Sequence, residues 1–217
     1  MEAASVRRPD GRFEREPAKE TAAPPTAAAM SIADPAPLGL AAFALTTFVL
    51  SFFNAGLVSS TGEPVVLGLA LAYGGLAQLL AGMWEFRNNN TFGATAFTSY
   101  GAFWLSFWYL VAHVDLSAAA PGDAGKGVGV FLLAWTIFTL YMLVCTLRTN
   151  TVLVAVFGVL FLTFVFLTWG SFSGTAGITH IGGYLGLLTA VLAWYGSMAG
   201  VMNATAKHAV LPVFPRN

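Results

Sequence analysis

The sequence predicts an all-α fold, that of a polytopic membrane protein in which six transmembrane helices form one bundle and both termini are cytoplasmic. Charged residues make up 9% of the chain and hydrophobic residues 57%, whereas about a quarter of the residues in a soluble domain are charged. Six continuous apolar stretches each approach the roughly 20 residues that a helix needs to cross a bilayer. A membrane barrel is not expected, because its strands would alternate apolar and polar residues over about 10 positions.

The six expected helices are joined by short connections, with one exception. The first follows the prolines at 35 and 37, the second ends before Arg87, and the third follows three consecutive asparagines. The fourth follows the one long loop, at 113–127. The link at 148–150 forces the fourth and fifth helices into an antiparallel pair, and 87–91 does the same for the second and third. The expected spans are 38–58, 65–84, 92–112, 128–147, 151–169 and 181–201.

The basic residues lie on one side of the predicted membrane. Of the ten Lys and Arg, nine precede the first helix, follow the last, or lie in the connections after the second and fourth helices. Only Lys126 lies on the opposite side, in the connection between the third and fourth helices. The positive-inside rule therefore places both termini in the cytoplasm, and an even number of spans also requires the termini to share a side. We expect a multi-pass protein of the inner or plasma membrane.

The ends of the chain differ from its centre in composition. Residues 1–33 are rich in Ala, Pro, Glu and Arg without apolar periodicity, which is typical of disorder. We expect a disordered cytoplasmic tail at 1–33, a six-helix transmembrane domain at 34–212 and a C-terminal tail at 213–217. A cleavable signal is not expected, because the first apolar run starts late and is too long. Cys145 is the single cysteine and the histidines lie at different helix ends, so no metal site or other cofactor is expected.

The interiors of the six stretches contain no Asp, Glu, Lys or Arg. A charge at bilayer depth costs several kcal/mol and usually marks a pump or an ion-coupled carrier. We therefore expect any solute to follow a neutral path. Hydroxyl and amide donors can stabilise a small carboxylate, its protonated acid, or a neutral solute such as ammonia or urea, and the residue types alone leave these alternatives open.

Polar side chains recur on the first three helices at steps of three or four residues, which place them on one side of a helix. Asn54 and Gln78 are the strongest candidates, because an unpaired buried amide costs several kcal/mol. A single hydroxyl more often bonds its own backbone or a neighbour. Glu85, beside Arg87, is interpreted as a solvated charge at a helix end rather than a proton relay. The residues expected to form hydrogen bonds along the path are Thr47, Asn54, Gln78, Thr95 and Ser99.

Three motifs occur in a specific order along the first half of the chain. The first reads DPAPLGLAAF at 34–43, and the second reads YGGLAQ at 73–78 with AG at 81–82 and Glu85. The third reads NTFG at 90–93 and continues through AFTSYG at 96–101 to FWL at 103–105. Together they resemble the acetate uptake transporter family, which includes the succinate-acetate permease. The similarity covers about residues 34–212.

The resemblance implies a six-helix subunit that assembles into a homohexamer, each subunit having its own pore for acetate and sometimes succinate. It implies an apolar constriction formed by Phe43 from the first motif, Tyr100 from the third and, through a looser alignment, Leu160 on the fifth helix. Such a constriction restricts passage by size and by dewetting. The expected partners are acetate and similar small carboxylates, the lipid bilayer and further copies of the chain. Enzyme activity and nucleic-acid binding are not expected.

One residue departs from the family pattern, since Asp34 stands where the family usually has Asn. A carboxylate can still cap the helix that follows, but it brings negative charge to the inner mouth. We expect this charge to weaken anion entry from the cytoplasm or to make it depend on pH. Asp34 and Glu85 are the residues expected at the pore mouth.

Other functions fit the sequence less well. Export of ammonia or another small neutral solute is the alternative within transport, and a non-transporting scaffold or sensor is a third class. The helix after His180 resembles the last helix of rhomboid proteases. The Gly-x-Ser-Gly turn that should supply a serine nucleophile in such an enzyme is absent from the fourth helix and its surroundings.

Overall fold

The computed structural model describes residues 5–7, 9–11, 13–15 and 32–216, and it divides into two units, residues 1–31 and 32–217. In the first unit, strands β1 (Ser5–Arg7) and β2 (Phe13–Arg15) pair antiparallel, with Ser5 opposite Arg15. These strands lie within the segment 1–33, for which the sequence analysis expected a disordered cytoplasmic tail, and that expectation stays a prediction. Residues 1–4, 8, 12 and 16–31 of the segment lie outside the described residues.

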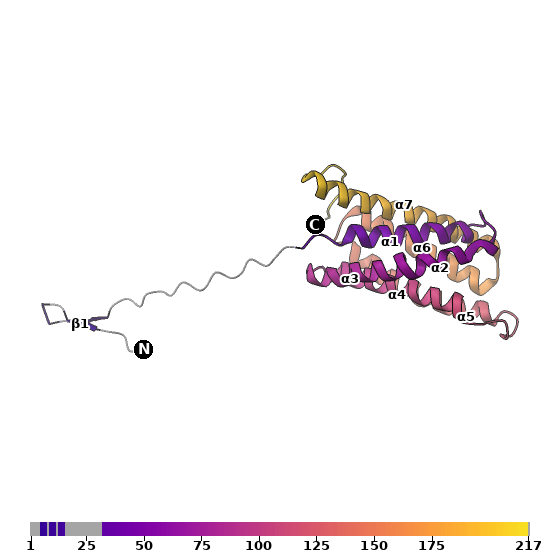
Figure 1. The fold of residues 1–217 in the computed structure, drawn as a ribbon, viewed down its shortest axis with the longest axis horizontal. Coiled ribbons are helices and arrows are strands. Elements are labelled where there is room, and N and C mark those ends of the chain that lie inside the picture. Colours follow the sequence, from indigo (N-terminus) through magenta and orange to yellow (C-terminus); the bar gives the residue numbers. More distant parts are fainter. Residues whose placement is uncertain (1–4, 8, 12, 16–31, 217) are drawn as a thin grey trace. The chain divides into compact units, whose positions relative to one another are not determined.

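Six helical rods make up the described part of the second unit (Figure 1). The second rod is composite, because a 3₁₀ turn, a short α-helix, a π-helical turn and a further α-helix follow one another without a break. These segments are η1 (Ser60–Val65), α2 (Val66–Leu71), η2 (Ala72–Ala77) and α3 (Gln78–Arg87). The other rods are α1 (Ala36–Asn54), α4 (Thr91–His113), α5 (Asp123–Thr146), α6 (Thr151–Ser173) and α7 (Ala176–Ala206). The predicted order of six helices is confirmed; the largest difference is in α7, which is longer at both ends than the expected 181–201.

Within the described residues, five of the six rods are long and apolar enough to cross a membrane by length and composition. The exception is α4, in which Gly, Ser, Thr and Tyr residues lower the mean hydropathy. Its 23 residues correspond to about 34 Å of helix, which exceeds the roughly 30 Å of a hydrocarbon core. Because α4 packs along the length of the second rod, we treat it as spanning with the others.

Short capped connections define the helix pairs. The side chain of Asn90 accepts a hydrogen bond from the backbone N–H of Gly93 at 3.0 Å, at the start of α4. Asn150 does the same for Leu153 at 2.9 Å, at the start of α6. Each amide oxygen satisfies one of the free N–H groups at a helix start. The pairs α3 with α4 and α5 with α6 therefore pack against each other, as predicted from the short links.

Helix α1 lies at the centre of the bundle. It packs against α7 and also contacts the whole second rod and α4, while α7 packs on α6 and α6 on α5. The approach of α1 to α7 is close, because a Cβ atom at Gly183 would overlap the backbone of Ala55 and one at Gly186 would overlap the Ser51 side chain. Residues on α1 are thereby held between the α4 side and the α6 side of the bundle.

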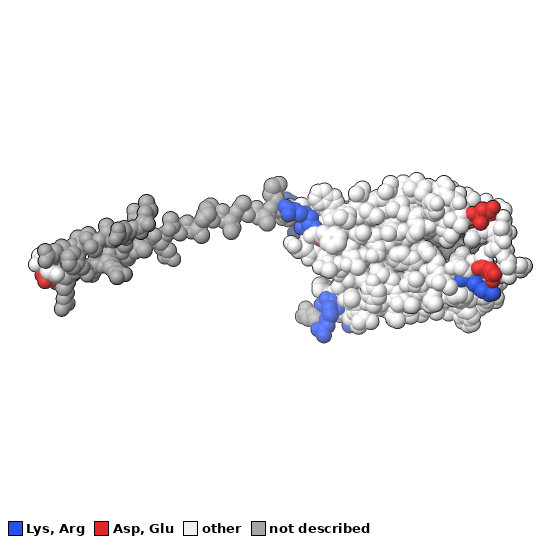
Figure 2. All heavy atoms as spheres, turned by 90° about the horizontal axis from the view of Figure 1, so that it is seen from below, with Lys and Arg blue, Asp and Glu red and all other residues white. Residues whose placement is uncertain are grey.

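Charged side chains of the bundle gather at its two ends, and the surface between them carries no charge on the face shown in Figure 2. Arg87 is the last residue of α3, and Arg148 and Lys207 follow α5 and α7; all three lie at the end where α1 begins. Lys126 lies at the opposite end and forms an ion pair with Asp123 at 3.0 Å. The uncharged surface between the ends is what a helix bundle presents to lipid.

Candidate permeation pathway

Three large side chains from three helices lie together in the centre of the bundle. Phe43 on α1, Tyr100 on α4 and Leu160 on α6 are 6%, 3% and 4% exposed. The ring centroids of Phe43 and Tyr100 are 5.8 Å apart. All three residues line both of two small cavities. They therefore separate one cavity from the other, and we call these three residues the collar.

The tyrosine of the collar is fixed at both ends of its side chain. Its hydroxyl and Thr139 Oγ1 on α5 are 2.9 Å apart and share a hydrogen bond. Its ring packs edge-on against Phe138, with centroids 5.3 Å apart, and against Phe157 at 6.0 Å. Because the phenol is bonded and the ring is packed on several sides, Tyr100 keeps one position in the collar.

On one side of the collar lies a cavity of about 40 Å³, here called the Trp104 cavity. Two buried polar atoms in its wall, Thr47 Oγ1 and Trp104 Nε1, have no hydrogen-bond partner within the described part of the chain. Leaving such a group unpaired costs about 1–3 kcal/mol, so both are free to bond a solute or water. The neighbouring Thr163 differs, because its hydroxyl donates to the Val159 carbonyl at 2.9 Å. The lining residues are Phe43, Thr47, Leu50, Ser51, Asn54, Tyr100, Phe103, Trp104, Leu160, Thr163, Phe164 and Leu167.

On the other side of the collar lies a cavity of about 20 Å³, here called the Gln78 cavity. Gln78 is its one amide side chain, is almost completely buried, and has an Oε1 atom without a partner among the described residues. It is the first residue of α3, directly after the π-helical turn η2. Such turns are frequent at functional sites. The lining residues are Phe43, Gln78, Ala96, Phe97, Tyr100, Phe157 and Leu160.

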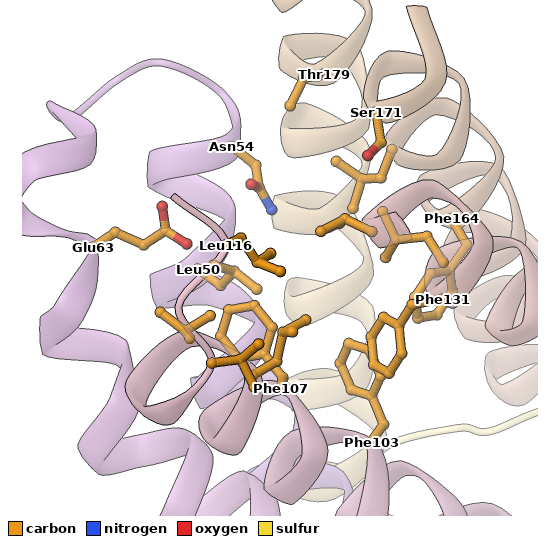
Figure 3. A pocket seen from close by; sticks show the side chains of 16 residues that line it. Leu50, Asn54, Glu63, Phe103, Phe107, Leu116, Phe131, Phe164, Ser171 and Thr179 are labelled. Carbon is orange, nitrogen blue, oxygen red and sulfur yellow. The ribbon is translucent and has the colours of Figure 1, made fainter. Parts of the chain in front are cut away.

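The Trp104 cavity continues into a larger hollow of about 440 Å³, here called the Glu63 vestibule. Figure 3 shows the Asn54 amide and the Glu63 carboxylate directed into this space from two different elements, above a floor of phenylalanine rings. The residues that line both the vestibule and the Trp104 cavity are Leu50, Asn54, Phe103, Phe164 and Leu167.

The Gln78 cavity adjoins a hollow of about 410 Å³ at the other end of the bundle, here called the Asp34 vestibule, through their common lining residue Phe97. Asp34 Oδ1 accepts a hydrogen bond from the backbone N–H of Ala36, the first residue of α1, at 2.9 Å. The C-terminal residues also contribute to the wall through Val213. Asn203 holds that segment in place by accepting from the Val210 N–H at 2.7 Å.

Two vestibules, two small cavities and the collar thus form a row along the bundle. The vestibules measure about 440 and 410 Å³, and the cavities beside the collar about 40 and 20 Å³. A single water needs about 10–15 Å³ on this kind of measure. The space at the collar is therefore close to the size of a few waters, and a larger solute must displace side chains there.

Seven of the ten predicted site residues line this row, and Thr95, Ser99 and Glu85 do not. The seven are Phe43, Tyr100, Leu160, Thr47, Asn54, Gln78 and Asp34. Thr95 and Ser99 are half-buried on α4 and line none of these cavities. The positions 95, 99, 102 and 106 follow one another at steps of four, three and four residues, so Thr95 and Ser99 share a face of α4 with Ala102 and Ser106. Both Ala102 and Ser106 are exposed. That face of α4 points away from the row.

Glu85 is not the solvated charge that the sequence analysis expected. Its side chain is fully buried, and Asn88 Nδ2 donates to its Oε2 at 3.4 Å. Its Oε1 lies against Gly93, where a Cβ atom would be 2.7 Å away. The physical reason is the tight pairing of α3 with the start of α4, which covers the carboxylate. Glu85 lines none of the cavities of the row, although Asn90 and Gly93 beside it line the Asp34 vestibule.

Sequence reasoning missed three residues of the site. Trp104 follows Tyr100 by one helical turn, so its side of α4 was predictable, but its unpaired N–H was not. Thr139 bonds Tyr100 across 39 positions of sequence, and no local pattern indicates such a partner. Glu63 lies in the connection before the second predicted span and reaches the vestibule only through the course of η1.

Comparison with known proteins identifies the family of the chain. Residues 17–216 match the profile described as the GPR1/FUN34/yaaH family. The chain belongs to this family. The predicted resemblance to acetate uptake transporters is thereby confirmed.

Among its relatives is the Succinate-acetate/proton symporter SatP of Escherichia coli K12, which is 41% identical over 84% of this chain and 95% of the relative. Acetate permease A of Emericella nidulans is 43% identical over 85% of this chain and 67% of that protein. Ammonia transport outward protein 2 of Saccharomyces cerevisiae is 44% identical over 84% of this chain. The chain spans 66% of the length of this yeast protein.

A solved structure has the same fold. It is described as the structure of the bacterial acetate channel SatP, and it matches with a TM-score of 0.77 and 39% sequence identity. The match covers 84% of this chain and 99% of the channel chain. The predicted fold class, a six-helix membrane bundle, is confirmed by this similarity.

Proposed function

We propose that this chain is a membrane permease or channel for acetate and related short carboxylates, including succinate, and that the solute moves along the row of cavities through the collar. The observation that carries the proposal is the row itself: two vestibules at opposite ends of the bundle, interrupted at one place by Phe43, Tyr100 and Leu160. The names of the bacterial symporter, the fungal permease and the bacterial channel support the choice of solute.

The chemistry of the path suits a solute that must bind weakly. On one side of the collar the Thr47 hydroxyl and the Trp104 N–H are available as donors for a carboxylate, and on the other side the unpaired Gln78 Oε1 is available as an acceptor for a protonated acid. No Lys or Arg lines any of the four cavities in the described residues. Conduction requires binding strong enough for entry and weak enough for release, and neutral donors meet both conditions. Between these polar groups the collar selects by size.

We propose further that the protein lies in the cell membrane with both termini cytoplasmic, so that the Asp34 vestibule opens inward and the Glu63 vestibule outward. The nine-to-one distribution of Lys and Arg supports this orientation. A homohexamer is proposed from the family resemblance, and each subunit would then contain its own row of cavities. Apolar faces on several helices, among them Val144 on α5 and Val191 on α7, are exposed in the single chain.

The decisive experiment is flux into liposomes that contain the purified full-length chain. Labelled acetate should enter with saturating kinetics, and the rate should exceed that of empty vesicles. Membrane current recorded in parallel distinguishes two modes: a current indicates the anion, and electroneutral uptake indicates the acid or a proton carried with the anion. Acetate entry no faster than in empty vesicles would refute the proposal.

Export of ammonia is the second candidate. It is favoured by the name of the yeast relative and by the neutral lining of the cavities beside the collar. Labelled methylammonium in the same vesicles tests it directly. Transport of methylammonium without acetate would select this function, and the reverse result would exclude it.

A further inference from the structure

In the part of the chain that the structure describes, each vestibule is lined by one acidic side chain and by no Lys or Arg. In the described residues, Glu63 is the one charged group that lines the first vestibule, and Asp34 is the one charged group that lines the second. Glu63 is half-buried, on the 3₁₀ turn η1, and its carboxylate points into the cavity (Figure 3). A permeating carboxylate therefore meets a like charge before it reaches the neutral donors at the collar.

The charge of Glu63 is not neutralised by the groups around it. No ion pair to Glu63 is present among the described residues, and the cation at this end, Lys126, lies 3.0 Å from Asp123 instead. Asp115 accepts from the Ser117 N–H at 2.8 Å, which holds the pKa of Asp115 below its usual value and keeps it anionic. The ionisable groups of this end that do not line the vestibule are His113, Asp115, Asp123, Lys126 and His180.

We propose that Glu63 determines specificity by solute charge, so that the chain favours monocarboxylates over dicarboxylates. This inference rests on the proposed transport function and narrows its substrate class. Repulsion between charges grows with the product of the charges, so a dianion such as succinate is repelled by Glu63 twice as strongly as acetate. The protonated acid is not repelled. The apolar walls of the vestibule reduce screening by water and salt, which strengthens the discrimination.

The expected size follows from Coulomb's law. One additional unit charge about 6 Å from Glu63, at an effective dielectric constant near 40, costs about 1.4 kcal/mol, which is a tenfold change in an equilibrium constant. Removal of the Glu63 charge is therefore expected to raise the ratio of succinate flux to acetate flux about tenfold. Acetate flux itself should rise by a smaller factor than succinate flux.

The test uses the full-length chain in liposomes at pH 7, with initial rates of labelled succinate and labelled acetate measured on the same vesicles. Glu63→Gln and Glu63→Ala remove the charge in two ways, so that a folding defect in one does not end the test. Glu63→Asp retains the charge, and Asp123→Asn removes a carboxylate from the same end of the bundle outside the vestibule. We expect the flux ratio to rise in the first two variants and to stay at the native value in the other two.

Two results would overturn the inference, and they are distinguishable. If acetate flux is intact but the ratio is unchanged in Glu63→Gln and Glu63→Ala, or rises equally in Asp123→Asn, Glu63 does not discriminate by charge. If native vesicles show no acetate flux at all, the proposed function fails and this inference fails with it.

Discussion

Replacing Leu160 by Ala tests the collar most directly. Leu160 is 4% exposed and forms part of the wall of both the 40 Å³ and the 20 Å³ cavities. Loss of its isopropyl group opens the partition between them, so the two cavities should join. A pocket contact with a single methylene discriminates by roughly 10- to 200-fold. We therefore expect the ratio of lactate flux to acetate flux to rise at least about tenfold, while acetate flux persists.

The matched control is Leu162→Ala, since Leu162 lies on the same helix but is 44% exposed and lines none of the four cavities. Leu160→Ala should also lower the free energy of unfolding, by roughly 2–5 kcal/mol for a buried leucine, and Leu162→Ala by less. Radiolabelled lactate and acetate uptake in liposomes, with thermal unfolding in detergent, measures both effects. A lactate-to-acetate ratio no higher in Leu160→Ala than in Leu162→Ala would show that Leu160 does not limit solute size.

Three further substitutions probe the polar groups beside the collar. Trp104→Phe removes the indole N–H, and a hydrogen bond from it to a charged solute contributes about 1.5–3 kcal/mol. The acetate concentration that gives half-maximal flux should therefore rise about tenfold or more. An unchanged concentration excludes Trp104 as a donor. Tyr100→Phe loses the hydrogen bond to Thr139, so the free energy of unfolding in detergent should fall by about 0.6 kcal/mol, and the ratio of lactate flux to acetate flux should change little. A large rise in that ratio would instead show that the Tyr100 hydroxyl is needed for size selection. Gln78→Leu removes a buried unpaired oxygen, so thermal stability should hold or rise while acetate flux falls; flux at the native rate would count against Gln78 as a solute ligand.

Much of the fold was predictable because membrane helices are long and almost wholly apolar. Six such stretches predict six helical rods. A link as short as 148–150 forces the two helices that it joins to run antiparallel and side by side. The composite second rod was not predicted in detail. The π-helical turn before Gln78 packs against α1 and α4, and a hydropathy average over the whole stretch does not reveal it.

The candidate site was predictable in part, and the two errors have the same origin. Thr95 and Ser99 share a face of α4, as the spacing indicates, but this face points away from the cavities. Glu85 was expected in solvent because it lies at a helix end beside Arg87, yet the start of α4 covers it. In both cases the residues that decide the environment belong to another helix.

The sequence by itself determined the membrane class, the number and order of the helices and the family, because hydropathy, spacing and motifs are local properties of the chain. The three collar residues stay a prediction from the family resemblance. The tertiary structure alone decided which helix faces enclose the row of cavities. It also decided, among the described residues, why Trp104 and Thr47 have unpaired polar atoms and how Glu63 comes to line a vestibule without a basic residue in its wall. Helical periodicity says which residues share a face. The direction in which that face points depends on packing between residues far apart in sequence.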